Sequence, residues 1–110
     1  MKYLSMFLLL IFSFKTFAER QTGIITGLVP FESNGKKIIV FKLEDNVSGE
    51  CNTTARFAFD DSKINYDLMA STLLSAYHSK TRVQVEFNRT CHAWGNSFDS
   101  RYICIGDINC

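Results

Sequence analysis

The sequence predicts a mainly β domain with a single helix, and three observations support this fold class. Short segments rich in β-branched and aromatic residues alternate with turn residues from position 22 to position 108. One segment, residues 65–80, instead carries apolar residues at helical spacing. The 110-residue chain holds 6 Gly and 1 Pro, so we expect one domain and no collagen-like or long disordered segment.

Residues 1–18 have the pattern of a secretory signal peptide. Lys2 supplies a positive start, residues 4–14 are a nearly unbroken apolar run, and Thr16 and Ala18 are small residues suited to a cleavage site. The apolar run is too short to span a bilayer as a helix, so we expect no membrane insertion. The expected mature chain is residues 19–110, a single secreted or periplasmic domain.

Without Lys2 and Lys15, 10 basic residues face 11 acidic ones, which gives the mature chain a net charge of −1. Such a chain releases few counterions on binding nucleic acid. We therefore expect no nucleic-acid partner.

All four cysteines lie in the expected mature chain, at Cys51, Cys91, Cys104 and Cys110. An even number in a small exported protein indicates disulfides, and three pairings are open. We favour Cys51–Cys91 with Cys104–Cys110. A zinc site is disfavoured because there is no Cys-x-x-Cys motif and because His92 directly follows Cys91.

The first three expected strands are residues 22–31, 36–43 and 51–59. Asn34-Gly35 is a strong hairpin signal between the first two. In the second strand Ile39, Phe41 and Leu43 share one face, with Ile38 and Val40 on the other. In the third, Cys51 shares a face with Phe57 and Phe59 and is expected to point inward.

A helix is expected next, with Asn65 as its N-cap and its end near Ser79-Lys80. Ile64 and Met69 would form a hydrophobic staple. The expected core face is Met69, Ala70, Leu73, Leu74, Ala76 and Tyr77.

Two strands follow the helix, at residues 82–88 and 101–108. In the first of them Val83, Val85 and Phe87 are expected to face inward and Glu86 outward. The resulting order, β-β-β-α-β-β, is that of a five-stranded OB-fold-like barrel.

The chain resembles the B subunits of subtilase cytotoxin and of the typhoid and pertussis-like toxins. The resemblance rests on residues 22–26 (Thr-Gly-Ile-Ile-Thr), on the helix end running into a strand at residues 74–87, and on the spacing of Cys104 and Cys110. It implies an OB-fold subunit that forms homopentamers, binds host glycans and can accompany a catalytic A subunit. It also implies that Thr22 takes the place of a serine that contacts the sugar.

A glycan site needs an aromatic surface for the sugar ring and polar groups for its hydroxyls. The loop at residues 89–100 offers Trp94, while Glu86, Asn88 and Arg89 lie beside it at a strand end. With Thr22, these are the candidate ligand-binding residues, and Arg89 or Arg82 would suit the carboxylate of an acidic sugar. The alternative is that Trp94 packs against the barrel and the polar groups are simply solvated.

The sequence carries none of the common catalytic motifs that we considered, such as Gly-x-Ser-x-Gly, paired metal-binding histidines or a phosphate loop. We therefore expect no enzyme activity, no cofactor and no metal. The leading hypothesis is a glycan-binding homo-oligomer, and the alternative is a structural or inhibitor-like protein that binds another protein. Three N-glycosylation patterns, at Asn46, Asn52 and Asn88, carry no meaning in a bacterial protein.

Overall fold

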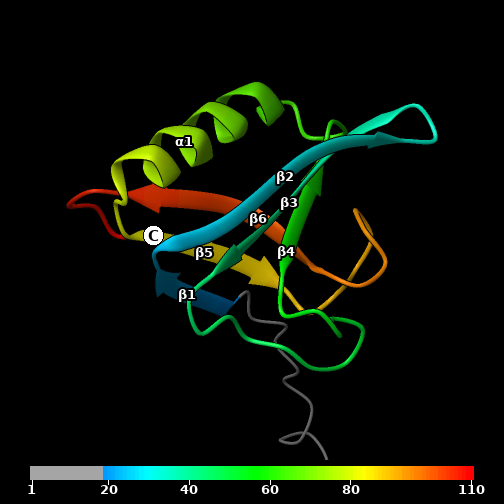
Figure 1. Ribbon diagram of the computed structural model, residues 1–110, viewed down its shortest axis with the longest axis horizontal. Coiled ribbons are helices and arrows are strands. Elements are labelled where there is room, and N and C mark those ends of the chain that lie inside the picture. Colours follow the sequence, from blue (N-terminus) through cyan, green and yellow to red (C-terminus); the bar gives the residue numbers. More distant parts are fainter. Residues whose placement is uncertain (1–18) are drawn as a thin grey trace, which may run out of the picture.

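Six strands and one helix make up residues 19–110, the part of the chain that the computed structural model describes (Figure 1). The expected signal peptide, residues 1–18, lies outside the described residues. Within residues 19–110, no helix combines the length and the hydropathy needed to cross a bilayer. The elements are β1 (Glu19–Gly23), β2 (Ile25–Ser33), β3 (Lys36–Leu43), β4 (Phe57–Asp60), α1 (Tyr66–Ser79), β5 (Val83–Asn88) and β6 (Phe98–Ile105).

The strands form one mixed sheet in the order β1-β5-β6-β4-β3-β2. All neighbours are antiparallel except β4 and β6, which run parallel. The prediction of a mainly β domain with one helix is confirmed, but the sheet has six strands where the sequence predicted five. The sheet does not close by hydrogen bonds, although its two edge strands, β1 and β2, are consecutive in the chain.

The extra strand arises because the first expected strand, residues 22–31, is interrupted at Ile24. β1 pairs with β5, whereas β2 pairs with β3, and a bulge lies between Ile25 and Gly27. Gly23 allows the close approach at the break, since a Cβ there would lie 3.4 Å from the Leu43 Cβ atom. Residues 19–33 therefore supply both edge strands of the sheet, β1 and β2.

The β2–β3 hairpin follows the sequence prediction closely. Asn34 and Gly35 both adopt positive φ, at 51° and 77°, as a tight two-residue turn requires. The two faces of β3 also separate as expected, because Ile39, Phe41 and Leu43 enter the main core while Ile38 and Val40 enter a second cluster.

The third expected strand, residues 51–59, is reduced to Phe57–Asp60, and Cys51 is exposed rather than inward-facing. Residues before β4 cannot continue the ladder, because Ala55 has a positive φ of 55°. In place of ladder bonds, the buried Asn52 side chain forms hydrogen bonds to the backbone of this segment. Its Nδ2 donates to the Val47 carbonyl, and its Oδ1 accepts from the Arg56 amide, both at 3.0 Å.

Helix α1 begins after Asn65 and ends at Ser79, within the expected bounds. Asn65 makes no side-chain capping bond, and Ile64 is fully exposed, so the predicted hydrophobic staple is wrong. The buried face is narrower than expected. It consists of Met69, Leu73 and Ala76, while Leu74 and Tyr77 are exposed.

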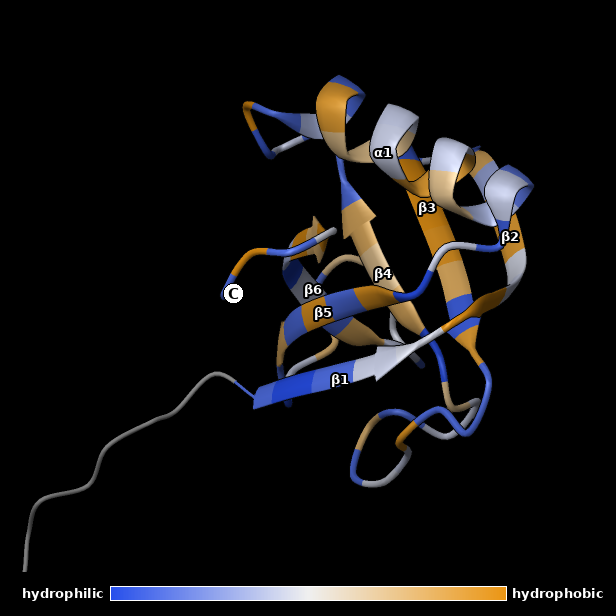
Figure 2. Ribbon diagram, turned by 90° about the vertical axis from the view of Figure 1, so that its left-hand side faces the viewer, coloured by the Kyte–Doolittle hydropathy of each residue, from blue (hydrophilic) through white to orange (hydrophobic). Residues whose placement is uncertain are grey.

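The main core lies between α1 and the sheet, and the apolar strand segments gather on that side (Figure 2). Phenylalanine dominates it, and neighbouring rings lie 5.0–6.3 Å apart between centroids. The largest fully buried side chains are Phe41, Phe57, Phe59, Phe87 and Phe98.

The last two strands differ from the prediction mainly in their bounds. β5 covers Val83–Asn88, but β6 starts at Phe98 and ends at Ile105, three residues ahead of the expected 101–108. Both favoured disulfides, Cys51–Cys91 and Cys104–Cys110, are present, and no cysteine among the described residues is free. Two disulfides indicate a protein that does not reside in the reducing cytoplasm.

Candidate functional site

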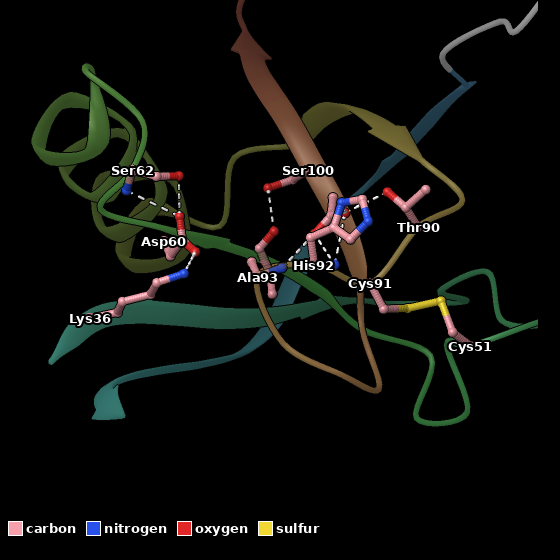
Figure 3. Close-up of polar contacts among 11 residues, drawn as sticks. Lys36, Cys51, Asp60, Ser62, Thr90, Cys91, His92, Ala93 and Ser100 are labelled. Carbon is pink, nitrogen blue, oxygen red and sulfur yellow. Dashed lines mark hydrogen bonds and ion pairs between the residues drawn. A yellow bond between two sulfur atoms is a disulfide. The ribbon is translucent and has the colours of Figure 1, made fainter. Parts of the chain in front are cut away.

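A polar hollow of about 170 Å³ lies on the face of the sheet opposite the main core. Its walls come from β4, from the segment that follows β4, from the loop after β5 and from β6. Side chains far apart in the sequence therefore converge on one small space (Figure 3). The polar side chains that line it are Asp60, Ser62, Lys63, Asn88, His92, Asp99, Ser100 and Arg101.

Asp60, at the end of β4, is a fixed negative charge in one wall. Burial alone would raise its pKa, but hydrogen bonds from the Ser62 amide and hydroxyl, together with the charge of Lys36, lower that pKa below its ordinary value. The Asp60 Oδ1 accepts from the Ser62 amide at 3.1 Å, and the Oδ2 lies 3.6 Å from the Lys36 Nζ. The Asp60 carboxylate is therefore ionised at neutral pH, and the positive charge of Lys36 offsets its negative charge.

Asp99, at the start of β6, holds the opposite wall in place. Its Oδ1 accepts from the backbone amides of His92 and Ala93, at 2.9 and 2.8 Å. Its Oδ2 accepts from the Thr90 hydroxyl, and the Asp99 amide donates to the Thr90 carbonyl at 2.8 Å. These bonds fix the loop after β5, so Asp99 acts as a structural anchor.

Two further bonds tie this loop down. The Cys51–Cys91 disulfide joins it to the segment before β4 (Figure 3). The Thr54 hydroxyl donates to the Asn96 carbonyl at 2.8 Å. The wall of the hollow is therefore preorganised for binding.

Four side chains that line the hollow can face a ligand. Asn88 offers an amide, while Lys63, His92 and Arg101 offer donors. Lys63 forms no ion pair among those found in the described part of the chain, and Arg101 reaches Glu86 only at 3.7 Å. Such a set suits hydrogen bonding to hydroxyls and to anionic oxygens.

No group of three or more His, Cys, Asp or Glu side chains within residues 19–110 could hold a metal ion. Within this range, His92 Nδ1 lies 3.4 Å from Asp99 Oδ2, and that carboxylate is already engaged by the loop amides.

The five residues proposed from the sequence do not share one site. Asn88 lines the hollow, whereas Thr22 is exposed on β1, opposite Gln84 of β5. Glu86, expected to face outward, is 6% exposed. Arginine side chains from the two neighbouring strands lie against it: Arg20 of β1 at 2.9 Å and Arg101 of β6 at 3.7 Å.

Neither arginine proposed for an acidic sugar is free. Arg89 bonds to Glu19 and Glu50, which raises its pKa, and its guanidinium lies 5.2 Å from the centroid of the Phe98 ring. Arg82 lies 3.5 Å from Glu44. Arg89 instead links the start of β1 to the disulfide-bonded segment around Cys51.

Trp94 lies beside the hollow, in a cluster on the outer face of the sheet. Its ring meets Phe31 edge-on at 4.8 Å, and both pack against Ile38, Val40 and Ala58. Trp94 is half-buried there. It packs against the sheet, as the alternative interpretation expects, and it keeps an accessible edge beside Gly95 and Asn96.

Sequence reasoning missed Asp60, Lys63 and Arg101 as site residues. Asp60 directly follows the expected third strand, and an Asp whose side chain can bond to the backbone two residues on, here at Ser62, is a signal for a side-chain turn. Lys63 and Arg101 carry no local signal, because only the parallel pairing of β4 with β6 brings their segments together.

Comparison with known proteins adds no relative. No family model, no curated protein and no solved structure matches this chain.

Proposed function

We propose that the protein is a secreted or periplasmic glycan-binding module with an OB-type barrel, similar to the B subunit of an AB5 toxin. The observation that carries this proposal is the polar hollow, in which Lys63, Asn88 and Arg101 converge from three segments next to the Trp94 cluster. Polar groups around a sugar-sized space beside an aromatic residue are the usual components of a glycan site.

The strand pairing supports the barrel. If β1 and β2 are taken as one bent strand, the chain has five strands with the helix between the third and the fourth. OB-folds bind oligosaccharides on the face of their second and third strands and with the loops after the first and fourth. Here these are β3, β4, the Asn34-Gly35 turn and the Trp94 loop. Phe31 and Trp94 join the two loops.

The exposed apolar surface of α1 supports assembly into a homo-oligomer. Leu74 and Tyr77 are 59% and 41% exposed, and Leu74 borders an apolar hollow of about 160 Å³ formed with Leu28 and Pro30 of β2. Adjacent exposed apolar groups of this kind mark protein contacts. The same surface also favours the alternative function, which is binding of a different protein.

A glycan array on the purified, oxidised protein tests the proposal. We expect discrete array signals that Asn88→Ala and Lys63→Ala abolish, because both residues line the hollow. Lys37→Ala is the matched control, since Lys37 is an exposed lysine outside the hollow. A silent array, or signals that survive both substitutions, would reject this site.

Light scattering tests the assembly. We expect a pentamer that Leu74→Glu dissociates, because the substitution places a charge in the apolar contact. A strict monomer would contradict the proposed assembly. A monomer that is recovered with another protein bound to α1 would favour the alternative function.

A further inference from the structure

A second hollow, of about 190 Å³, lies on the outer face of the sheet next to the Trp94 cluster and carries two basic residues. Gly27, Val29, Val40, Lys42 and Arg56 line it. Val40 belongs both to this hollow and to the Trp94 cluster. The two features therefore form a continuous surface over β2, β3 and β4.

Lys42 and Arg56 come together at the end of the β3–β4 ladder. Phe41 of β3 is opposite Phe57 of β4, Lys42 follows Phe41, and Arg56 precedes Phe57. Both side chains are exposed and line the same hollow. Two like charges that share so small a space repel each other.

Neither cation is offset by an acidic side chain within residues 19–110, because none of the ion pairs found there includes Lys42 or Arg56. Glu44, the acidic residue nearest to Lys42 along the chain, pairs with Arg82. Both cations are therefore available to an anionic ligand.

On β2, the strand on the other side of β3, a glycine leaves the space beside Lys42 open. Gly27 of β2 is opposite Lys42, and a Cβ at Gly27 would meet nothing within 4 Å. Val29 is 52% exposed beside it. The hollow therefore combines two unpaired cations with an apolar wall and unoccupied space.

We propose that Lys42 and Arg56 form a site for a phosphate or sulfate ester carried on a saccharide. Two positive charges match the charge of about −1.5 to −2 on a phosphomonoester at neutral pH, or that of neighbouring sulfates. Arginine binds such oxygens through two parallel N–H donors, and lysine adds a point charge. The sugar ring would lie on the exposed side chain of Val29, which lines the same hollow. This inference rests on the proposed glycan-binding function and adds the ligand's charge.

Titration calorimetry tests the site with four saccharides and with a single-stranded oligonucleotide. The saccharides are a heparin-derived sulfated tetrasaccharide, its desulfated counterpart, mannose 6-phosphate and mannose. We expect the sulfated and phosphorylated probes to bind at least about tenfold more tightly than their uncharged or carboxylate-only counterparts. Equal affinities within each pair would overturn the inference, and so would equally tight binding of a single-stranded oligonucleotide.

Three variants locate the binding. Lys42→Gln and Arg56→Gln should each weaken binding of the sulfated probe by about tenfold. Gly27→Glu should weaken it too, by placing a carboxylate next to Lys42. Lys37→Gln is the control for general charge, and an equal loss in that variant would overturn the proposed site.

The same experiment separates the two proposals. If neutral glycans bind and depend on Asn88, but sulfate or phosphate adds nothing, only the ester site is wrong. If the sulfated and phosphorylated probes bind through Arg56, but no glycan signal depends on Asn88 or Lys63, only the proposed glycan site in the polar hollow is wrong.

Discussion

The ring of Trp94 meets the ring of Phe31 edge-on, with centroids 4.8 Å apart. This contact joins the loop after β5 to the end of β2, two segments separated by more than sixty residues. It also caps a small apolar cluster on the outer face of the sheet, formed by Ile38, Val40 and Ala58. We therefore expect Trp94 to contribute to the stability of the fold, whatever its part in binding.

Trp94→Ala should lower the free energy of unfolding by about 2 kcal/mol, roughly half the cost of deleting a fully buried aromatic ring. Urea unfolding, followed by far-ultraviolet circular dichroism, measures this loss. Trp94→Phe is the matched variant and should retain most of the stability. If the alanine variant is as stable as the native protein, the ring is not packed against Phe31.

Asp60 should make the stability of the protein depend on pH in the acid range. Its pKa in the folded protein lies below the ordinary value of 3.8, so its contribution is fully present above pH 4. That contribution is lost as the pH falls through the lower, folded-state pKa. Asp60→Asn should thus be less stable than the native protein at pH 7, and the difference should shrink below pH 4.

Unfolding free energies measured from pH 2 to pH 7 would show this convergence. Asp107→Asn, at an exposed position after β6, is the control and should follow the native curve. A constant offset between Asp60→Asn and the native protein at every pH would contradict the lowered pKa.

Local patterns predicted a good part of the fold. The turn at Asn34-Gly35, the alternation along β3 and the end of α1 near Ser79 each depend on neighbours within a few residues, and all three are confirmed. The disulfide pairing was also favoured correctly.

The errors arose where distant segments decide the structure. The break at Ile24 exists because the residues before it pair with β5 and the residues after it pair with β3. No pattern in the neighbouring residues predicts this break. Glu86 looked exposed by alternation, but strands on both sides bury it with Arg20 as its partner. The candidate site shows the same dependence on distant segments. Asn88 could be proposed from its place at a strand end beside the Trp94 loop. Lys63 could not, because only the pairing of β4 with β6 brings its segment to the hollow.

Asp99→Asn should loosen the loop that forms one wall of the polar hollow. An amide has one acceptor oxygen, and its NH2 group would face a donor among the groups that now bond to the carboxylate. Losing charge-assisted bonds of this kind costs about 1–3 kcal/mol.

Hydrogen exchange of the His92 and Ala93 amides measures this change directly. Both should exchange faster in Asp99→Asn while the amides of β3 stay protected. Asp45→Asn, an exposed substitution in another loop, should leave both rates unchanged. Unchanged protection in Asp99→Asn would show that the carboxylate does not hold the loop.

The two disulfides should contribute unequally, because they close loops of very different length. Cys51 and Cys91 are 40 residues apart, whereas Cys104 and Cys110 are 6 apart. On the chain-entropy model, the long link stabilises the fold by about 4 kcal/mol and the short one by about 2 kcal/mol. Replacing both cysteines of a pair with serine removes a link without leaving a free thiol.

Cys51→Ser/Cys91→Ser should therefore be the less stable double variant in urea unfolding. Because Cys91 lies next to His92 and partly packs against the main core, its loss should also reduce glycan binding. Cys104→Ser/Cys110→Ser should keep that binding, since this pair lies at the far end of β6. A larger loss of stability or of binding in the second variant would show that the short link, and not the long one, supports the site.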